Sequence, residues 1–146
     1  MKKILVLVIC LFLTSCGNNT ISNLDINAAS NDLDSLYTNM YEMDKNELLV
    51  IYGLDVDKCD EYVIKASSLS NGNFYAILKV NSDNMNEIKN QMNYMFDVLE
   101  NQSNLYSPEA KQKIENRLET NIGDFLIYLV GDDTDELYEC VKAHIN

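Results

Sequence analysis

The side chains of this chain that could do chemistry are mainly its 23 Asp and Glu residues, and two runs of them are dense enough to suggest a metal site. The first run consists of Asp55, Asp57, Asp60 and Glu61. An EF-hand calcium loop counted from Asp55 needs an oxygen ligand at its fifth position and glycine at its sixth, but Cys59 and Asp60 stand there. The second run, 132–136, is typical of a helix's first turn, where acids complement the helix dipole. We therefore predict no metal site in either run.

Other groups that could act in catalysis are few. The single histidine, His144, falls in the last turn of a predicted helix, where a positive charge also suits the dipole. The sequence contains no glycine-rich phosphate loop, no histidine-containing metal motif and no nucleophile elbow. In so acidic a chain, spacing does not single out any carboxylate pair. We predict no catalytic, cofactor-binding or metal-binding residue, and no cofactor.

The first 16 residues contain a different kind of signal. Lys2 and Lys3 precede an apolar run from Ile4 to Leu13, and the run is closed by Leu13-Thr14-Ser15-Cys16. As a helix, the run is roughly 15 Å long, about half the thickness of the hydrocarbon core of a bilayer, so it is too short to span a membrane. A short apolar run behind lysines is typical of a cleaved secretory signal.

The same residues resemble the bacterial lipoprotein signal, which ends in a lipobox of leucine, two small or β-branched residues and cysteine. The resemblance implies that residues 1–15 are removed and that Cys16 becomes the lipidated N-terminus, on the extracytoplasmic face of the cell membrane. Two or three acyl chains anchor a protein stably, whereas a single chain binds reversibly. The alternatives are an ordinary cleaved signal, with Cys16 incidental, and a buried N-terminal strand.

The charge balance limits the partners of the chain. There are 11 Lys and Arg residues against 23 Asp and Glu, and loss of Lys2 and Lys3 with the signal gives a net charge of −14. Such a surface repels nucleic acid and anionic headgroups, which excludes tight binding to a phosphate backbone. We expect no nucleic-acid partner. We also expect the protein to be attached to the membrane through the lipid alone. An envelope protein or an extracellular ligand is the expected further partner.

The chain after the signal divides into a tether and one domain. Residues 16–30 are rich in Asn, Ser, Thr and Ala, which predicts a flexible tether with a reach of roughly 20 Å. Residues 31–146 are long enough for one domain with a hydrophobic core and too short for two.

The spacing of apolar residues predicts the elements of this domain. Helices are expected from Asp32 to about Tyr41, from the capping box of Asp44 and Glu47 to Gly53, over 84–102, from Ser107-Pro108 to about Glu119, and from Asp133 onward. Strands are expected over 61–67 and 74–80, as an antiparallel hairpin, and over 125–130, the most buried strand. The order α-α-β-β-α-α-β-α predicts an α+β domain with a small, mainly antiparallel three-stranded sheet backed by helices.

Cys59 and Cys140 are the cysteines left after removal of the signal and lipidation of Cys16. An extracytoplasmic setting permits a disulfide that closes a loop of about 82 residues, worth roughly 4 kcal/mol in the chain-entropy model. The predicted helix register places Cys140 beside the apolar face of the last helix, where a buried free thiol is as favourable as a disulfide. We expect free thiols.

Several short motifs, taken in order, point to a second family. They are Tyr52-Gly53-Leu54-Asp55, Glu61-Tyr62-Val63, Lys79-Val80, Tyr106-Ser107-Pro108 and Gly123-Asp124-Phe125. Their order and spacing over about residues 36–140 resemble an uncharacterised module of bacterial lipoproteins called domain of unknown function 4358. Relatives are expected to have an acidic residue where the second strand opens, and this chain has Phe74 there. The resemblance implies a fold and an extracytoplasmic habitat, but no mechanism, because the family has no assigned activity.

These observations lead to one expected function and one alternative. We expect a membrane-anchored extracytoplasmic lipoprotein whose domain is a non-catalytic binding or interaction module. Its nine tyrosines are enough to leave some aromatic surface for a partner, because tyrosine combines apolar area with a polar tip. The alternative is an envelope hydrolase that uses carboxylates.

Overall fold

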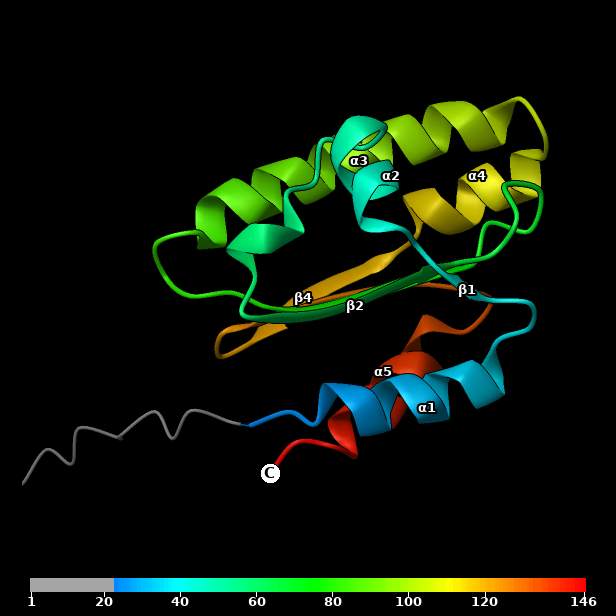
Figure 1. Cartoon of the computed structure of the whole chain (residues 1–146). Helices are drawn as coiled ribbons and strands as arrows, with labels where there is room; N and C mark the ends of the chain where they lie inside the picture. Colours follow the sequence, from blue (N-terminus) through cyan, green and yellow to red (C-terminus); the bar gives the residue numbers. More distant parts are fainter. Residues whose placement is uncertain (1–22) are drawn as a thin grey trace, which may run out of the picture.

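The computed structural model describes residues 23–146, which form an antiparallel sheet between two layers of helices (Figure 1). The strands are β1 (Tyr41–Glu42), β2 (Glu61–Ala66), β3 (Phe74–Lys79), β4 (Leu118–Ile122) and β5 (Phe125–Val130). The helices are α1 (Ile26–Leu36), α2 (Lys45–Val50), the single 3-10 turn η1 (Val56–Lys58), α3 (Met85–Asn104), α4 (Pro108–Glu115) and α5 (Thr134–Lys142). Cys16 and the predicted signal lie outside the described residues.

The sheet has five strands in the order β1-β2-β3-β5-β4. The predicted hairpin of β2 and β3 is confirmed, with Glu61 paired to Lys79 and Ala66 to Phe74. The prediction of a three-stranded sheet was wrong, because β1 and β4 add one strand at each edge. β1 is only two residues long and has no sequence pattern of its own. The helix expected from Ser107 was predicted to run to about Glu119. In the structure α4 ends at Glu115, and β4 begins three residues later at Leu118.

A two-residue turn joins β4 to β5. Ile122 pairs with Phe125, and between them Gly123 has a φ of +55°. Type II′ hairpin turns place glycine at this first position, because it needs a positive φ. The side chains of β4 alternate between half-buried and exposed, as expected for an edge strand with one face toward the protein interior.

β3 and β5 are the central strands and are covered on both faces. Phe74, Ala76 and Leu78 pack against α2, α3 and α4, whereas Tyr75 and Ile77 pack against α1 and α5. The two helix layers lie on opposite sides of the sheet in Figure 1. All six residues of β5 are buried, which confirms the prediction for this strand. A continuous apolar run is what a strand with helices on both faces requires.

The long helix α3, which was predicted over 84–102, turns its apolar side to the sheet. Ile88, Met92, Met95, Phe96 and Leu99 recur every three or four residues, and all are buried in the core between α3 and the sheet. This side of α3, which includes Met92 and Met95, is therefore a core face.

Three predicted N-caps are confirmed. The side chains of Asp44, Ser107 and Asp133 each accept a hydrogen bond from the backbone N–H three residues on, at 3.3, 3.2 and 3.0 Å. These bonds satisfy donors at the starts of α2, α4 and α5 that have no partner within the helix. The local sequence thus sets where these helices begin.

The packed domain begins earlier than the predicted boundary at residue 31. Leu24 forms a β-bridge with Ile145, and α1 starts at Ile26. Residues 24–30 therefore belong to the domain and not to a flexible tether, because α1 has an apolar face that packs in the same core as α5. Among residues 23–146, no helix is both long enough and apolar enough to cross a lipid bilayer.

Candidate functional site

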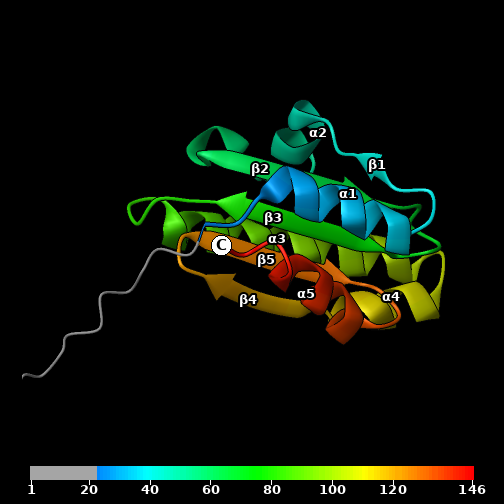
Figure 2. The same ribbon diagram turned by 90° about the horizontal axis from the view of Figure 1, so that it is seen from below.

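A hollow of about 230 Å³ lies between α3 and the edge strand β4. It is lined by seven residues, which we call the α3–β4 groove: Lys89 and Asn93 of α3, Glu119, Thr120 and Asn121 of β4, and Leu126 and Tyr128 of β5. Leu126 and Tyr128 are buried and form its floor. Figure 2 shows β4 at the edge of the sheet, next to β5.

Helix and strand periodicity bring these side chains together. Lys89 and Asn93 are four residues apart and therefore lie on one face of α3. Glu119 and Asn121 are two residues apart and share a face of β4. Their partners in β5 belong to the core under α3, so Glu119 and Asn121 also lie on the α3 side of the sheet. The groove thus has a helical wall and a strand wall.

Lys89 determines the charge that the groove offers to a ligand. Seven other basic side chains form ion pairs with carboxylates: Lys45, Lys58, Lys65, Lys111, Lys113, Arg117 and Lys142. Lys89 is half-buried and has no such partner within residues 23–146. In a chain with a net charge of −12, this ammonium group remains available to an anionic group of a ligand.

Arg117 fixes the neighbouring side chains of the groove. Its Nε lies 2.5 Å from a carboxylate oxygen of Glu119, and its Cζ lies 4.2 Å from the centroid of the Phe96 ring. The Phe96 ring packs in turn against Tyr128, with the centroids 5.5 Å apart. The carboxylate of Glu119 is therefore already paired, and the unpaired charge in the groove is that of Lys89.

Tyr128 contributes a neutral hydroxyl group. Burial, and to a smaller extent the nearby Glu119 carboxylate, raises the pKa of Tyr128 to about 12. The phenol is therefore protonated at neutral pH, where it can donate and accept hydrogen bonds. Among residues 23–146, Glu119 is the single carboxylate that lines the groove, whereas carboxylate-based glycoside hydrolysis uses a pair. This arrangement is suited to binding.

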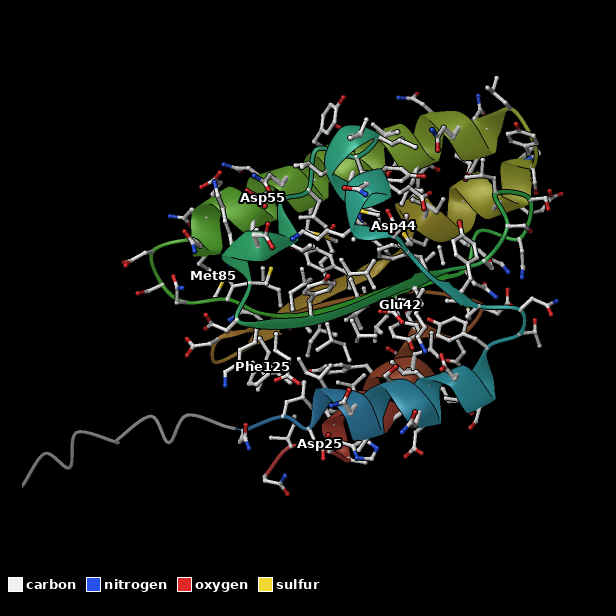
Figure 3. The ribbon with its side chains drawn as sticks, viewed as in Figure 1. Asp25, Glu42, Asp44, Asp55, Met85 and Phe125 are labelled. Atoms are coloured by element: carbon white, nitrogen blue, oxygen red, sulfur yellow. The ribbon has the colours of Figure 1, made fainter. Side chains whose placement is uncertain are left out.

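The carboxylates of the first acidic run make local contacts. Asp55 accepts a hydrogen bond from the N–H of Asp57 at the start of η1, and Asp57 pairs with Lys45. Figure 3 shows Asp55 on the same side of the sheet as Asp44, the cap of α2. Within residues 23–146, no three His, Cys, Asp or Glu side chains are grouped closely enough to hold a metal ion.

The second acidic run lies at the turn from β5 into α5, beside two further hollows of about 320 and 120 Å³. The larger one contains Lys113, whose Nζ is 2.9 Å from Asp132. The described part of the chain contributes no basic residue to the smaller one. Neither hollow therefore offers an unpaired positive charge, and the α3–β4 groove is the stronger candidate for an anionic ligand.

His144 lies in the other helix layer. Its Nε2 is 2.7 Å from Oδ2 of Asp32, so the pair links the chain after α5 to α1. The sheet separates α1 and α5 from α3 (Figure 1), and the histidine therefore takes no part in the groove.

Cys59 and Cys140 are both free, in agreement with the expectation. Cys59 packs against the core on the α3 side of the sheet and Cys140 against the core on the α1 side. Burial, followed by the nearby Asp60 carboxylate, raises the pKa of Cys59 to about 12, and burial also raises the pKa of Cys140. Because the thiolate is the nucleophilic form, neither cysteine is activated for chemistry.

The tyrosines contribute more to the core than to the surface. Tyr37, Tyr52, Tyr75 and Tyr128 are buried, whereas Tyr41, Tyr94 and Tyr106 are exposed. Tyr94 lies beside Gly53, which follows α2, and the preceding residues Leu49, Val50 and Ile51 are exposed as well. The helix layer of α2 and α3 therefore has apolar side chains on its outer side.

The sequence did not reveal any residue of the groove as functional. Alternation of Leu118, Thr120 and Ile122, followed by Gly123 at a turn, was the available signal for β4. No spacing rule relates Lys89 to that strand, because strand order brings them together.

The comparisons with known proteins agree with the short motifs. A family model described as Domain of unknown function (DUF4358) matches residues 33–131. Neither a curated protein nor a solved structure matches the chain. The matched range includes all five strands and the helices α2, α3 and α4, and therefore the whole groove. Since the match covers more than half of the chain, the protein belongs to the DUF4358 family, a domain of unknown function.

Proposed function

We propose that this protein is a membrane-anchored extracytoplasmic lipoprotein whose domain binds a partner through the α3–β4 groove. The observation that carries the binding role is Lys89, a half-buried lysine without a carboxylate partner in residues 23–146, above the buried side chains of Leu126 and Tyr128. A ligand that covers this floor and supplies a carboxylate gains both apolar contact and a charge-assisted hydrogen bond.

The size of the groove favours a macromolecular partner. Its volume of about 230 Å³ is below the roughly 300–1,000 Å³ that is typical of pockets for whole small molecules. A hollow of this size suits one side chain of a larger ligand. The domain is therefore proposed to recognise another protein of the envelope or an extracellular polypeptide.

The anchor rests on the N-terminal sequence. Lys2, Lys3, the apolar run and the lipobox support lipidation of Cys16. Cys16 precedes Asn23 by seven positions, which span at most about 25 Å when fully extended. The carbonyl of Asn23 accepts a hydrogen bond from the N–H of Asn146 at 2.8 Å. The end of the domain that contains both residues is therefore proposed to face the membrane.

Replacement of Cys16 tests the anchor. We expect Cys16→Ser either to release the protein from the membrane fraction or to leave an uncleaved precursor, because the lipid is attached to this sulfur. Cys10→Ser is the matched control. Cys10 lies within the predicted signal, so this substitution should leave fractionation unchanged. Membrane retention of a normally processed Cys16→Ser protein would contradict the lipoprotein assignment.

Site-specific photo-crosslinking in intact cells tests the binding role. A photoreactive residue in place of Asn93 should give a discrete crosslinked product that disappears with Lys89→Glu. The same residue in place of Asp135, which is exposed on α5 in the opposite layer, is the control. Identical products from both positions, or products that Lys89→Glu leaves intact, would refute a binding role for the groove.

A further inference from the structure

We infer that the partner enters the groove as an extended peptide segment, which pairs with β4 as a sixth strand and places one acidic side chain against Lys89. This inference rests on the proposed binding role and adds the conformation and chemistry of the ligand. It follows from the free backbone edge of β4 and from the side chains beside that edge.

The hydrogen bonds of neighbouring strands show which backbone groups of β4 are free. The N–H of Val80 donates to the carbonyl of Asp124 at 2.8 Å, so even-numbered residues along β5 direct their backbone groups toward β3. Odd-numbered residues of β5 then face β4, where their partners are the even-numbered residues. The backbone groups of Glu119 and Asn121 therefore point away from the sheet.

The outer edge of β4 is open within residues 23–146. No backbone hydrogen bond joins Glu119 or Asn121 to a described segment outside the β4–β5 hairpin. β1, at the opposite edge, is protected because it is only two residues long. β4 has five residues in regular register and contains neither proline nor lysine, which often block edge pairing. Such an edge is a template for an added strand.

The side chains beside this edge select the sequence of the added strand. Alternate residues of a strand beside β4 point to the α3 side of the sheet, toward the groove. One of these side chains fits the volume of about 230 Å³. The ammonium group of Lys89 favours a carboxylate there, and the amides of Asn93 and Asn121 are further donors to it. The remainder of the segment should be neutral or basic, because the net charge of −12 repels polyacidic peptides.

Selection of random dodecapeptides displayed on phage, against the full chain in detergent, tests this inference. Enriched peptides should alternate apolar and polar residues and contain an Asp or Glu at a fixed position. Asn121→Pro removes an outward N–H at an edge position where proline is tolerated, and Lys89→Gln removes the charge. Each variant should weaken binding of the selected peptides by about tenfold or more, which is about 1.4 kcal/mol. Lys142→Gln, in the opposite helix layer, should leave affinity unchanged.

Amide hydrogen exchange provides the direct readout of strand pairing. In the free protein, the amides of Glu119 and Asn121 should exchange rapidly, and those of Thr120 and Ile122 slowly. A bound peptide should slow exchange of the first two amides by about tenfold or more. A peptide that binds without this protection, or whose affinity is unaffected by exchanging its acid for the amide, overturns the inference.

Two further outcomes would also overturn it. One is a selection that enriches no peptide over the Asn121→Pro protein. The other is an acetate titration that shifts the resonances of Lys89 and Asn93 in a chain that binds no peptide, which would make the groove a site for small anions. The crosslinking from Asn93 is an independent test of the proposed function. If the crosslinking succeeds while the peptide experiments fail, the binding role of the groove is supported and the addition of a sixth strand is refuted.

Discussion

The guanidinium carbon of Arg117 lies 4.2 Å from the centroid of the Phe96 ring. The same guanidinium group pairs with Glu119 of β4 and, at 2.8 Å, with Glu100 of α3. The side chain of Arg117 is only 18% exposed, so solvent screens these contacts less than it screens a surface ion pair. Arg117 therefore connects the two walls of the groove.

We predict that Arg117→Ala lowers the free energy of unfolding by about 1–2 kcal/mol, because it removes the cation–π contact and leaves Glu100 and Glu119 without their partner. Arg117→Lys should recover only part of this loss, since an ammonium group lacks the planar fork. Urea denaturation measures both. Lys111→Ala, which breaks an (i, i+4) pair on α4, is the control and should cost about 0.5 kcal/mol or less. Equal losses would show that Arg117 acts as an ordinary surface charge.

A second prediction compares two glycines with positive φ. Gly72 and Gly123 have φ values of +74° and +55°. A Cβ on Gly72 would lie 2.8 Å from the Cα of Ala110, whereas a Cβ on Gly123 would have no neighbour within 4 Å in the described chain. Alanine at either position costs about 1 kcal/mol for the left-handed backbone, and Gly72→Ala adds a clash worth roughly 1–3 kcal/mol. Urea denaturation should find Gly72→Ala the more destabilised; equal costs would contradict the close approach of the β2–β3 turn to α4.

Elements that depend on local chemistry could be predicted from the sequence. The caps at Asp44, Ser107 and Asp133 were found because each hydrogen bond spans only three residues. The run from Phe125 to Val130 was recognised as a buried strand because its apolar residues are continuous.

Elements that depend on partners far away in the sequence could not be predicted. Tyr41 belongs to a strand only because it pairs with Ala66. The start of α1 was predicted to be a polar tether, because its few apolar residues form a core only when they pack together with α5. The groove has the same origin, since Lys89 meets Asn121 through the strand order and not through any spacing along the chain.

A third prediction compares two serines near the turn from α3 to α4. Ser103 is fully buried and its Oγ has no hydrogen-bond partner among residues 23–146, whereas Ser107 Oγ accepts a hydrogen bond from the N–H of Ala110. Ser107→Ala should cost about 0.5–2 kcal/mol, because α4 loses its cap. Ser103→Ala removes a buried hydroxyl that gains no bond, so the free energy of unfolding should stay equal or rise by up to about 1 kcal/mol.

Urea denaturation of both alanine variants distinguishes these roles. The hydroxyl of Ser103 lies beside a cavity of about 20 Å³, roughly enough for one water molecule. A loss above about 1 kcal/mol for Ser103→Ala would contradict the prediction and would indicate a bridging water in this cavity.

The last prediction concerns alkaline pH. Burial is the main cause that raises the pKa of Tyr52, Tyr128 and Cys59 to about 12, from ordinary values of 10.0 for tyrosine and 9.0 for cysteine. Between its ordinary and its raised pKa, each group has lost its proton in the unfolded chain and keeps it in the folded protein. The contribution of these groups to the free energy of unfolding is therefore fully present below about pH 9. It decreases as the pH rises toward 12, by about 1.4 kcal/mol per pH unit for each group.

Absorbance at 295 nm, which reports phenolate, and circular dichroism measured over the same pH range test this coupling. Phenolate from the buried tyrosines should appear together with loss of the folded signal, because these phenols ionise only when the protein unfolds. Tyr128→Phe should reduce the slope of stability against pH between 10 and 12 by about 1.4 kcal/mol per pH unit, since it removes one of the linked groups. An unchanged slope would mean that Tyr128 ionises in the folded protein, and its phenolate would then be accessible to solvent within the groove.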